Sequence, residues 1–212
     1  MTDTLETIRT AYNTLAELYH ERMKEIPPNP LDDALVDVFA ELVGDAGPIA
    51  DLGCGQGRLT DYLTASGHDA FGIDLSPEML AYARASYPEL RFSRGSMTEL
   101  DIPDGSVAGV LSWYSTIHTP PTVVPTILAE FRRVLAPGGY LLLGFFSGDD
   151  LDGEPREFDH RVTPGFRWPT GLYVELLAEA GLVEVARVER EPGAEERFRH
   201  GRVLARKPSE AA

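Results

Sequence analysis

The sequence predicts an α/β fold, in which a mostly parallel β-sheet is covered by helices on both faces. From residue 48 onward, short apolar segments alternate with helical segments, the pattern of a parallel sheet with crossover helices. A glycine-rich turn, residues 53–57, joins the first apolar segment to the next helix. The last two apolar segments have no helix between them, so we expect a hairpin that gives the sheet an antiparallel edge.

The first half of the chain begins with two predicted helices. Apolar residues at helical spacing predict a helix over residues 5–25 and a second from Leu31 to Leu42, with an N-cap near Asn29. A buried strand is predicted at residues 49–52, a helix at 59–65 and a second strand at 69–74. Ser76 and Pro77 predict the start of the next helix, as N-cap and first-turn residue.

The second half continues the alternation. Strands are predicted at residues 91–93, 107–113 and 140–146, with a helix at 123–135 between the last two. A helix at 170–180 precedes the final strands, at 183–188 and 198–205. Residues 147–169 show no period, and we interpret them as a long loop that borders or covers a site.

Length and composition limit the domain organisation. A chain of 212 residues is long enough for one sizeable core and short for two domains. We therefore expect a single domain over residues 1–212, with a helical cap or lid over 1–45 and the sheet-based core over 46–206. The single cysteine, Cys54, forms no internal disulfide, and the N-terminus has no basic or apolar leader pattern. A cytoplasmic protein is expected.

The net charge bears on the kind of partner. The chain has 19 basic and 34 acidic residues, a formal charge of -15. Nucleic-acid binders need clustered Lys and Arg to neutralise phosphates. The sequence therefore favours a small-molecule substrate over nucleic acid. It has no apolar run of the roughly 20 residues that cross a bilayer, so no membrane partner is expected. The oligomeric state is left open between monomer and homodimer.

The turn Gly53-Cys54-Gly55-Gln56-Gly57 follows a strand and precedes a helix. Glycine allows a sharp turn and close approach to a ligand, and the helix start directs N–H groups toward it. The third glycine comes one residue earlier than in the dinucleotide pattern G-x-G-x-x-G. The turn therefore indicates a nucleotide-like ligand, and its spacing disfavours one with a pyrophosphate.

Two acids flank this turn. Asp51 ends the first strand, where its carboxylate suits an ammonium group, and Asp74 ends the second strand, where it suits two ribose hydroxyls. The alternative is a bare tight turn, with Asp74 merely capping the next helix. The order of strand, turn, helix, strand and acid favours the binding interpretation.

Several segments together resemble the class I S-adenosylmethionine-dependent methyltransferase family. Residues 49–59 and 72–79 resemble its first two motifs, and 103–106 and 134–143 its later motifs. Residues 11–19 are similar to the N-terminal helix of its small-molecule members. The resemblance implies a Rossmann-like three-layer sandwich with a seven-stranded sheet, and S-adenosyl-L-methionine as cofactor. It is specific for fold and cofactor, and it does not identify the methyl acceptor.

The resemblance also assigns cofactor contacts. Family members often carry Asp after the glycine of the third strand; here Ser96 follows Gly95, and Ser96 with Met97 is expected to contact the adenine instead. The expected cofactor-binding residues are Tyr19, Asp51, Gly53, Gly55, Arg58, Asp74, Leu75, Met79, Ser96, Met97, Ser112 and Trp113.

Catalytic candidates follow the fourth strand. Residues 112–118 are expected at the carboxyl edge of the sheet, where ligands bind in open α/β folds. His118 is the candidate general base, and Tyr114 is expected to orient the acceptor. The alternatives are a hydrogen-bonded loop histidine and a tyrosine that packs on the cofactor, since methyl transfer mainly requires alignment.

Further candidates lie on the first helix and in the long loop. Tyr12 and Tyr19 share a helix face, which serves either for packing or as a lid; Tyr12 is expected to reach the substrate. Arg167 and Trp168 suit a planar or anionic acceptor, or else a packing cluster. The histidines have no metal-ligand spacing, so no metal is expected.

Three functions compete. The leading one is an enzyme that transfers methyl to an oxygen or nitrogen of a small molecule, with oxygen preferred because His118 then has a task. A non-catalytic S-adenosylmethionine-binding regulator is the alternative. An NAD-dependent oxidoreductase is disfavoured by the early third glycine and by the lack of a Tyr-x-x-x-Lys pair.

Overall fold

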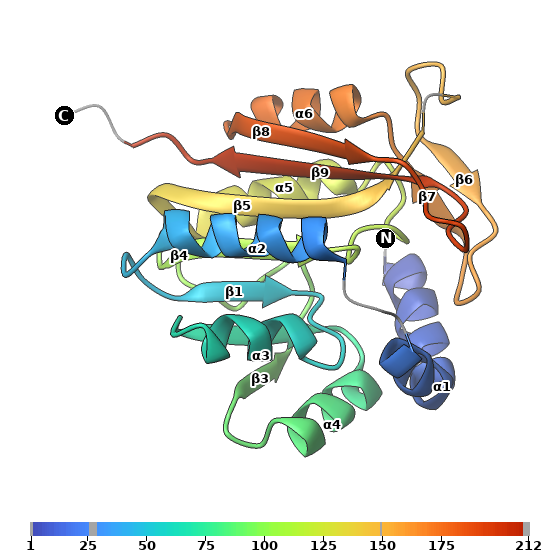
Figure 1. Cartoon of the computed structure of the whole chain (residues 1–212), viewed down its shortest axis with the longest axis horizontal. Helices are drawn as coiled ribbons and strands as arrows, with labels where there is room; N and C mark the ends of the chain where they lie inside the picture. Colours follow the sequence, from blue (N-terminus) through green and yellow to red (C-terminus); the bar gives the residue numbers. More distant parts are fainter. Residues whose placement is uncertain (1, 26–28, 149, 210–212) are drawn as a thin grey trace.

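The computed structural model describes residues 2–25, 29–148 and 150–209, arranged in three layers (Figure 1). Its middle layer is a seven-stranded sheet. In spatial order the strands are β3 (Arg91–Arg94), β2 (Ala70–Asp74), β1 (Ile49–Leu52), β4 (Val107–Trp113), β5 (Leu135–Ser147), β9 (Arg199–Arg206) and β8 (Val183–Arg190). Among these strands, β9 alone runs against its neighbours. The predicted Rossmann-like α/β fold with an antiparallel last strand is confirmed.

Helices cover both faces of the sheet. On one face lie α2 (Pro30–Val43) and α3 (Arg58–Ala65), and on the other α5 (Val124–Val134) and α6 (Thr170–Glu179) (Figure 1). Side chains along β5 alternate between the two faces, because successive strand residues point in opposite directions. Leu142 packs in the core under α2 and α3, whereas Leu141 and Leu143 pack in the core under α5 and α6.

Two helix starts follow the predicted cap chemistry. The Asn29 side chain accepts hydrogen bonds from the backbone N–H groups of Leu31 and Asp32 at the start of α2. The Ser76 hydroxyl accepts one from the Met79 N–H at the start of α4 (Pro77–Ser86), directly before the proline. Each cap satisfies N–H groups that have no partner within the helix. Both predicted caps are confirmed.

The structure differs from the prediction in three places. The 147–169 segment contains a hairpin, β6 (Arg156–Phe158) with β7 (Gly165–Arg167), whose strands are too short to show a period. Strand β5 begins at 135 instead of the predicted 140, and its pairing with β4 shifts register over this added part. The sheet edge is β8, which runs parallel to β5, so the antiparallel strand β9 lies inside the sheet.

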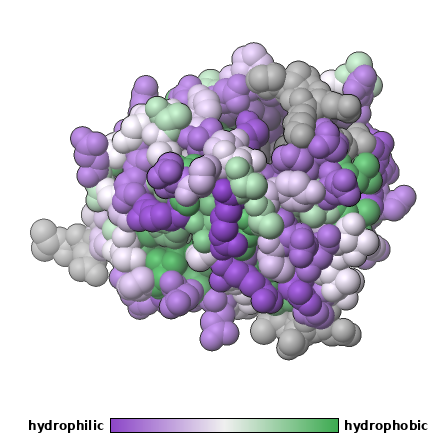
Figure 2. Space-filling view, turned by 90° about the horizontal axis from the view of Figure 1, so that it is seen from below, coloured by the Kyte–Doolittle hydropathy of each residue, from purple (hydrophilic) through white to green (hydrophobic). Residues whose placement is uncertain are grey.

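The long first helix, α1 (Thr2–Glu25), lies at the carboxyl ends of the strands, on the same side as the β6–β7 hairpin (Figure 1). Seen from the β3 end, the surface is mostly hydrophilic with separate apolar patches (Figure 2). None of the helices in the described part of the chain has the length and apolar character to cross a bilayer.

Candidate active site

The glycine turn between β1 and α3 contains three glycines with positive φ: 78° at Gly53, 53° at Gly55 and 82° at Gly57. A Cβ on Gly53 would lie 2.2 Å from Cβ of Ser115, and one on Gly57 would lie 2.5 Å from the Phe92 ring. At Gly55 no described atom lies within 4 Å of that position. Packing therefore requires the outer two glycines, while Gly55 leaves open space where a ligand can approach the backbone.

Asp51 ends β1 beside this turn and is buried, with 2% of its surface exposed. Its Oδ2 accepts a 2.7 Å hydrogen bond from Oγ1 of Thr60 on α3. Burial raises the pKa of this carboxyl from 3.8 to about 7, because a charge is costly away from water. Asp51 forms no ion pair within the described residues, so its carboxylate is available to pair with a cationic group of a ligand.

Asp74 ends β2 and ties the turn to the start of α4. Its Oδ2 accepts a 2.8 Å hydrogen bond from the Gly55 N–H, and its Oδ1 accepts one of the same length from the Ser76 N–H. Burial raises the pKa of Asp74, and the two backbone hydrogen bonds lower it in part. Since Ser76 is the helix cap, the alternative role for Asp74 as that cap is not needed. Each carboxylate oxygen keeps lone pairs for further donors.

Helix α1 covers the glycine turn through polar contacts and rings. The Ser76 hydroxyl donates a 2.7 Å hydrogen bond to Oδ1 of Asn13. The distance from Nδ1 of His20 to Oε1 of Gln56 in the turn is 2.5 Å. The His20 ring stacks on that of Tyr82 of α4, with 4.4 Å between the ring centres. His20 thus holds α1 to both the turn and α4, and Asn13 holds it to the start of α4.

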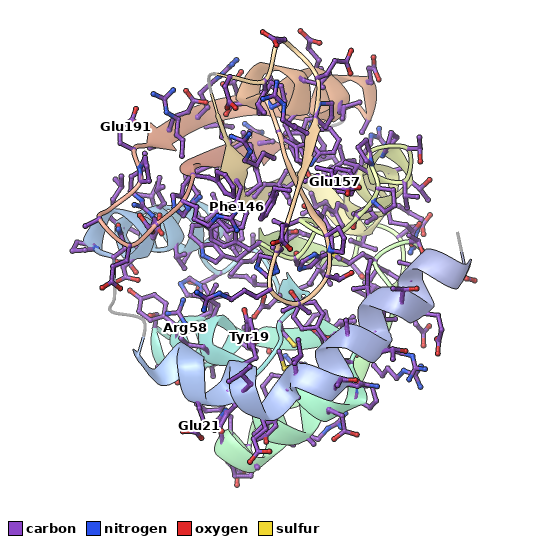
Figure 3. The ribbon with its side chains drawn as sticks, turned by 90° about the vertical axis from the view of Figure 1, so that its right-hand side faces the viewer. Tyr19, Glu21, Arg58, Phe146, Glu157 and Glu191 are labelled. Carbon is purple, nitrogen blue, oxygen red and sulfur yellow. The ribbon has the colours of Figure 1, made fainter. Side chains whose placement is uncertain are left out.

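The inner face of α1 carries the two predicted tyrosines. Their rings meet edge to face at 5.9 Å, and burial raises the pKa of both phenols, to which the charge of Asp74 adds. Figure 3 shows Tyr19 and Arg58 on the side of α1 that faces the domain, and Glu21 on its outer side. The structure thus brings Tyr12 and Tyr19 together over the site.

His118 lies in the loop after β4 and is buried, with 5% of its surface exposed. Its Nδ1 is 3.0 Å from the carbonyl oxygen of Pro164. A carbonyl only accepts, so Nδ1 carries a proton and, in the neutral ring, Nε2 carries the lone pair. Burial lowers the pKa of this imidazole from 6.5. Nε2 is buried without a hydrogen-bond partner among the described residues. It is therefore available to accept a proton, as a general base requires.

A series of ring contacts, which we call the aromatic belt, runs from α1 across His118 to β9. His118 meets the Tyr12 ring at 5.5 Å and the His160 ring at 4.7 Å. His160 meets Phe158 at 5.8 Å, and Phe158 meets Phe198 at 4.8 Å. The belt consists of Tyr12, His118, His160, Phe158, Phe146 and Phe198, of which Phe146 contacts the other two phenylalanines at 5.6 and 6.1 Å.

Residues 49–139, which hold the glycine turn, Asp51, Asp74 and His118, match the family of the methyltransferase domain. An uncharacterized methyltransferase of Mycobacterium tuberculosis is 31% identical over 160 residues, which is 74% of this chain and 60% of that protein. These matches assign residues 49–139 to the methyltransferase-domain family, and the chain as a whole is similar to S-adenosylmethionine-dependent methyltransferases. It spans about 60% of the length of these curated methyltransferases.

Two more methyltransferases are similar. Trans-aconitate 2-methyltransferase of Rhizobium meliloti is 36% identical over 116 residues, which is 50% of this chain and 40% of that enzyme. The Burkholderia thailandensis 1,6-didemethyltoxoflavin-N1-methyltransferase, solved with 1,6-didemethyltoxoflavin and S-adenosylhomocysteine, has a TM-score of 0.74. That match covers 96% of this chain and 88% of the solved one at 21% identity, so it shows the shared fold.

Tyr114, a predicted catalytic residue of this methyltransferase-family chain, faces away from the belt's histidine end. It has a φ of 55°, rare for a residue with a side chain. Its hydroxyl accepts a 2.7 Å hydrogen bond from Arg202 and contacts Nδ1 of His200. Burial raises the pKa of its phenol to about 12. The structure places its hydroxyl in this network on β9, and its role toward an acceptor stays a prediction.

The predicted acceptor residues of the long loop are engaged elsewhere. Arg167 forms two hydrogen bonds, of 2.8 and 2.9 Å, with the carboxylate of Asp150. Trp168 is 1% exposed and packs on Tyr173 in the core. Both arrangements match the packing alternative more closely than a contact with substrate, and no observation tests the substrate roles directly.

The other predicted cofactor residues surround the turn or follow the strands. Leu75 and Met79 lie with Asp74 at the start of α4, and Arg58 begins α3. Ser96 bonds to Thr98 within its own turn, and Ser112 bonds to Ser115 behind Gly53. Trp113 lies under the guanidinium of Arg202, at 4.5 Å, on the α2 side. Met97 packs against the core under α5. Their cofactor contacts stay predictions.

Sequence reasoning missed several residues of this site: Asn13, His20, Gln56, Thr60 and His160 contact the groups named above. Thr60 lies nine residues after Asp51, in the first turn of the helix that follows the glycine turn. Its contact with Asp51 could therefore have been predicted from sequence spacing. The others depend on how α1 and the hairpin pack. Within the described residues, no group of three His, Cys, Asp or Glu side chains is arranged to hold a metal ion.

Proposed function

We propose that this chain transfers a methyl group from S-adenosyl-L-methionine to an oxygen or nitrogen of a small-molecule acceptor. The observation that carries the proposal is a pair of carboxylates, the buried Asp51 and the half-buried Asp74, on either side of a glycine turn with open space at Gly55. Neither acid forms an ion pair within the described chain, and a carboxylate held away from water is costly unless a ligand compensates it.

The donor set fits S-adenosylmethionine. Asp51 suits the ammonium of the methionine part, because a positive charge there favours the ionised carboxylate. Asp74 suits the ribose hydroxyls, which donate hydrogen bonds to its remaining lone pairs. When bound, the cofactor supplies a methyl group on a positively charged sulfur. The chain's own residues hold the cofactor, align the acceptor and exclude water.

His118 supplies the proton acceptor in this proposal. Its Nδ1–H is fixed on the Pro164 carbonyl, which directs the Nε2 lone pair into the site. With the cofactor and acceptor bound, Nε2 would accept the proton that the acceptor atom loses on methylation. A hydroxyl acceptor uses this base most, since it must lose its proton to become a good nucleophile.

Residues 1–45 act in the proposal as a helical cap on the core over 46–206. The half-buried rings of Tyr12 and Tyr19 and the His20–Gln56 contact lie over the glycine turn, so in this proposal α1 opens to admit the cofactor. Closing it removes water from the site, which strengthens every charge interaction inside. A single domain in a monomer or homodimer, in the cytoplasm, remains the prediction.

The small acceptor is supported by charge and by the similar proteins. A formal charge of -15 disfavours nucleic acid. The names of the two characterised relatives refer to small molecules, one an unsaturated organic acid and one a planar heterocycle. The belt of rings beside His118 offers aromatic surface, and aromatic rings pack well against other rings.

The test combines binding and turnover. Isothermal titration with S-adenosylhomocysteine measures cofactor affinity, and transfer of a radiolabelled methyl group to a panel of hydroxyl and amino compounds measures activity. Asp74→Asn should weaken S-adenosylhomocysteine binding about tenfold or more, with exposed Asp45→Asn as the matched control. Tight binding without transfer to any acceptor would favour a regulatory protein instead. NADH binding without S-adenosylhomocysteine binding would overturn the proposal.

A further inference from the structure

The aromatic belt ends at the guanidinium group of Arg197, whose charge is not neutralised by a described carboxylate. The Arg197 side chain is exposed, and its Cζ lies 4.9 Å from the Phe198 ring centre and 5.9 Å from that of Phe158. Its Nη1 donates a 2.7 Å hydrogen bond to the Asp159 carbonyl. In the described part of the chain, no carboxylate forms an ion pair with Arg197.

Neighbouring arginines differ in this respect. Arg167 stacks on the same Phe198 ring at 4.5 Å, but its charge is neutralised by Asp150. The other arginines of β8 and β9 near this end also face carboxylates: Arg190 faces Glu196, Arg199 faces Glu189 and Glu191, and Arg202 faces Asp32. The chain has an excess of acids, yet Arg197 at the end of the aromatic belt pairs with none of those described. This indicates that Arg197 binds an anionic ligand.

The belt between His118 and Arg197 is aromatic, and its rings meet edge to face. Phe146, Phe158 and Phe198 each remain partly exposed, although aromatic side chains gain by burial against another ring. Figure 3 shows Phe146 beside the hairpin that carries Glu157, at the carboxyl edge of the sheet. Their exposed ring surface suits a further aromatic ring, while His118 and Arg197 provide a proton acceptor at one end and a cation at the other.

We propose that the acceptor is a planar, conjugated hydroxy acid, with its hydroxyl at His118, its ring on the aromatic belt and its carboxylate on Arg197. This inference rests on the proposed function, because it takes His118 as the methyl-transfer end. A guanidinium matches a carboxylate with two parallel hydrogen bonds, which a neutral amide does not replace. Arg197 is thereby the residue that selects acids over neutral compounds.

Binding of four probes to the full chain with S-adenosylhomocysteine tests the inference. The probes are 4-hydroxybenzoate, 4-hydroxycinnamate, the amide of the latter, and the saturated 3-(4-hydroxycyclohexyl)propanoate. The two aryl acids differ in the distance from hydroxyl to carboxylate. We expect at least one aryl acid to bind about tenfold or more tightly than the amide and than the saturated acid.

The variant Arg197→Gln isolates the charge. It should raise the Kd of the preferred aryl acid about tenfold and leave the Kd values of the amide and of S-adenosylhomocysteine unchanged. Arg187→Gln is the matched control, since Arg187 is also exposed but pairs with Glu184 on β8; it should change none of them. Both side chains lie at the surface, so neither substitution should unfold the chain.

The outcomes separate the two proposals. If S-adenosylhomocysteine binds but the aryl acids bind no better than the amide, or Arg197→Gln leaves their Kd unchanged, the inference is overturned and the proposed function stands. If the saturated acid binds as well as the aryl acids, planar recognition is overturned. If S-adenosylhomocysteine does not bind, the proposed function fails, and this inference fails with it.

Discussion

Thr60 and Asp51 are joined by a 2.7 Å hydrogen bond between a hydroxyl on α3 and a carboxylate buried at the end of β1. This single donor does not offset burial, which keeps the pKa of Asp51 near 7. Without a neighbouring cation this carboxyl therefore keeps its proton up to about pH 7, and a cation placed beside it would favour the ionised form. That relationship links protein stability, pH and cofactor binding.

The first prediction concerns stability without cofactor. The folded pKa of Asp51 lies above its ordinary value of 3.8, so between about pH 4 and 7 the folded chain binds a proton that the unfolded chain does not. This group's contribution therefore makes the free energy of unfolding fall as pH rises through that window. Asp51→Asn, which carries no charge, should be more stable than the parent at pH 8 by on the order of 2–4 kcal/mol. Its advantage should vanish near pH 4. Urea titrations measure both, with Asp45→Asn as control, and equal stabilities at pH 8 would contradict the prediction.

The second prediction concerns proton release. An ammonium placed at Asp51 lowers the pKa of the carboxyl, so binding of S-adenosylhomocysteine near pH 6.5 should release a proton. Titration calorimetry in phosphate and in imidazole, which differ in ionisation enthalpy, should give different apparent binding enthalpies. The difference should disappear in Asp51→Asn, which should also bind more weakly. Proton uptake, or an unchanged difference in the variant, would count against an ammonium at this position.

The third prediction concerns His118. Because burial lowers the pKa of this imidazole from 6.5, the base should be neutral at pH 7, and kcat/KM should fall only below the ordinary histidine range. His118→Gln should lower kcat by about 10²–10⁴-fold and remove that acidic limb, with little change in S-adenosylhomocysteine affinity. His68→Gln, in the turn after α3, is the control. A variant that retained full turnover would leave His118 with a packing role.

The sequence predicts most of the fold because its signals are local. Apolar segments of four to seven residues bounded by Gly, Pro or Asp mark β1, β2 and β4, and Asn29 and Ser76 mark helix starts. The hairpin β6–β7 escapes prediction because each strand has three residues. The antiparallel strand is predicted from the missing helix, but its position inside the sheet depends on the pairing of β9 with β5.

The candidate site is predictable where it follows the strands. Asp51, Asp74 and His118 each come at or soon after a strand end, and the parallel sheet brings these ends to one edge. Contacts between distant segments are not predictable in this way. Arg202 forms a hydrogen-bonded ion pair with Asp32, which lies 170 residues earlier in the chain. Arg167, which the sequence predicts to bind a substrate, is instead paired with Asp150. The sequence also gives no sign that Arg197, which directly follows two glutamates, lacks an ion pair among the described residues.

The fourth prediction concerns the buried pair behind Tyr114. Arg202 is 1% exposed, and it holds both the Asp32 carboxylate and the Tyr114 hydroxyl. Removing one partner leaves a charge buried alone, so Arg202→Met and Asp32→Asn should each lose about 3–5 kcal/mol of unfolding free energy. The double variant Arg202→Met with Asp32→Asn should lose less than the sum of the two single losses. Strictly additive losses in urea unfolding would show that the pair is not coupled.

The last prediction concerns the opening of α1. His20 reaches Gln56 at 2.5 Å and stacks on Tyr82, so His20→Ala should free this end of the helix. Amide hydrogen exchange over residues 5–21 should be faster in the variant, and S-adenosylhomocysteine should slow it less than in the parent. Because the ligand enters and leaves when α1 opens, the dissociation rate should rise severalfold and the association rate should not fall. Stopped-flow fluorescence measures both rates, with His68→Ala as control. Unchanged exchange and dissociation would mean that α1 packs as a fixed part of the core, and the cofactor would then have to enter by another route.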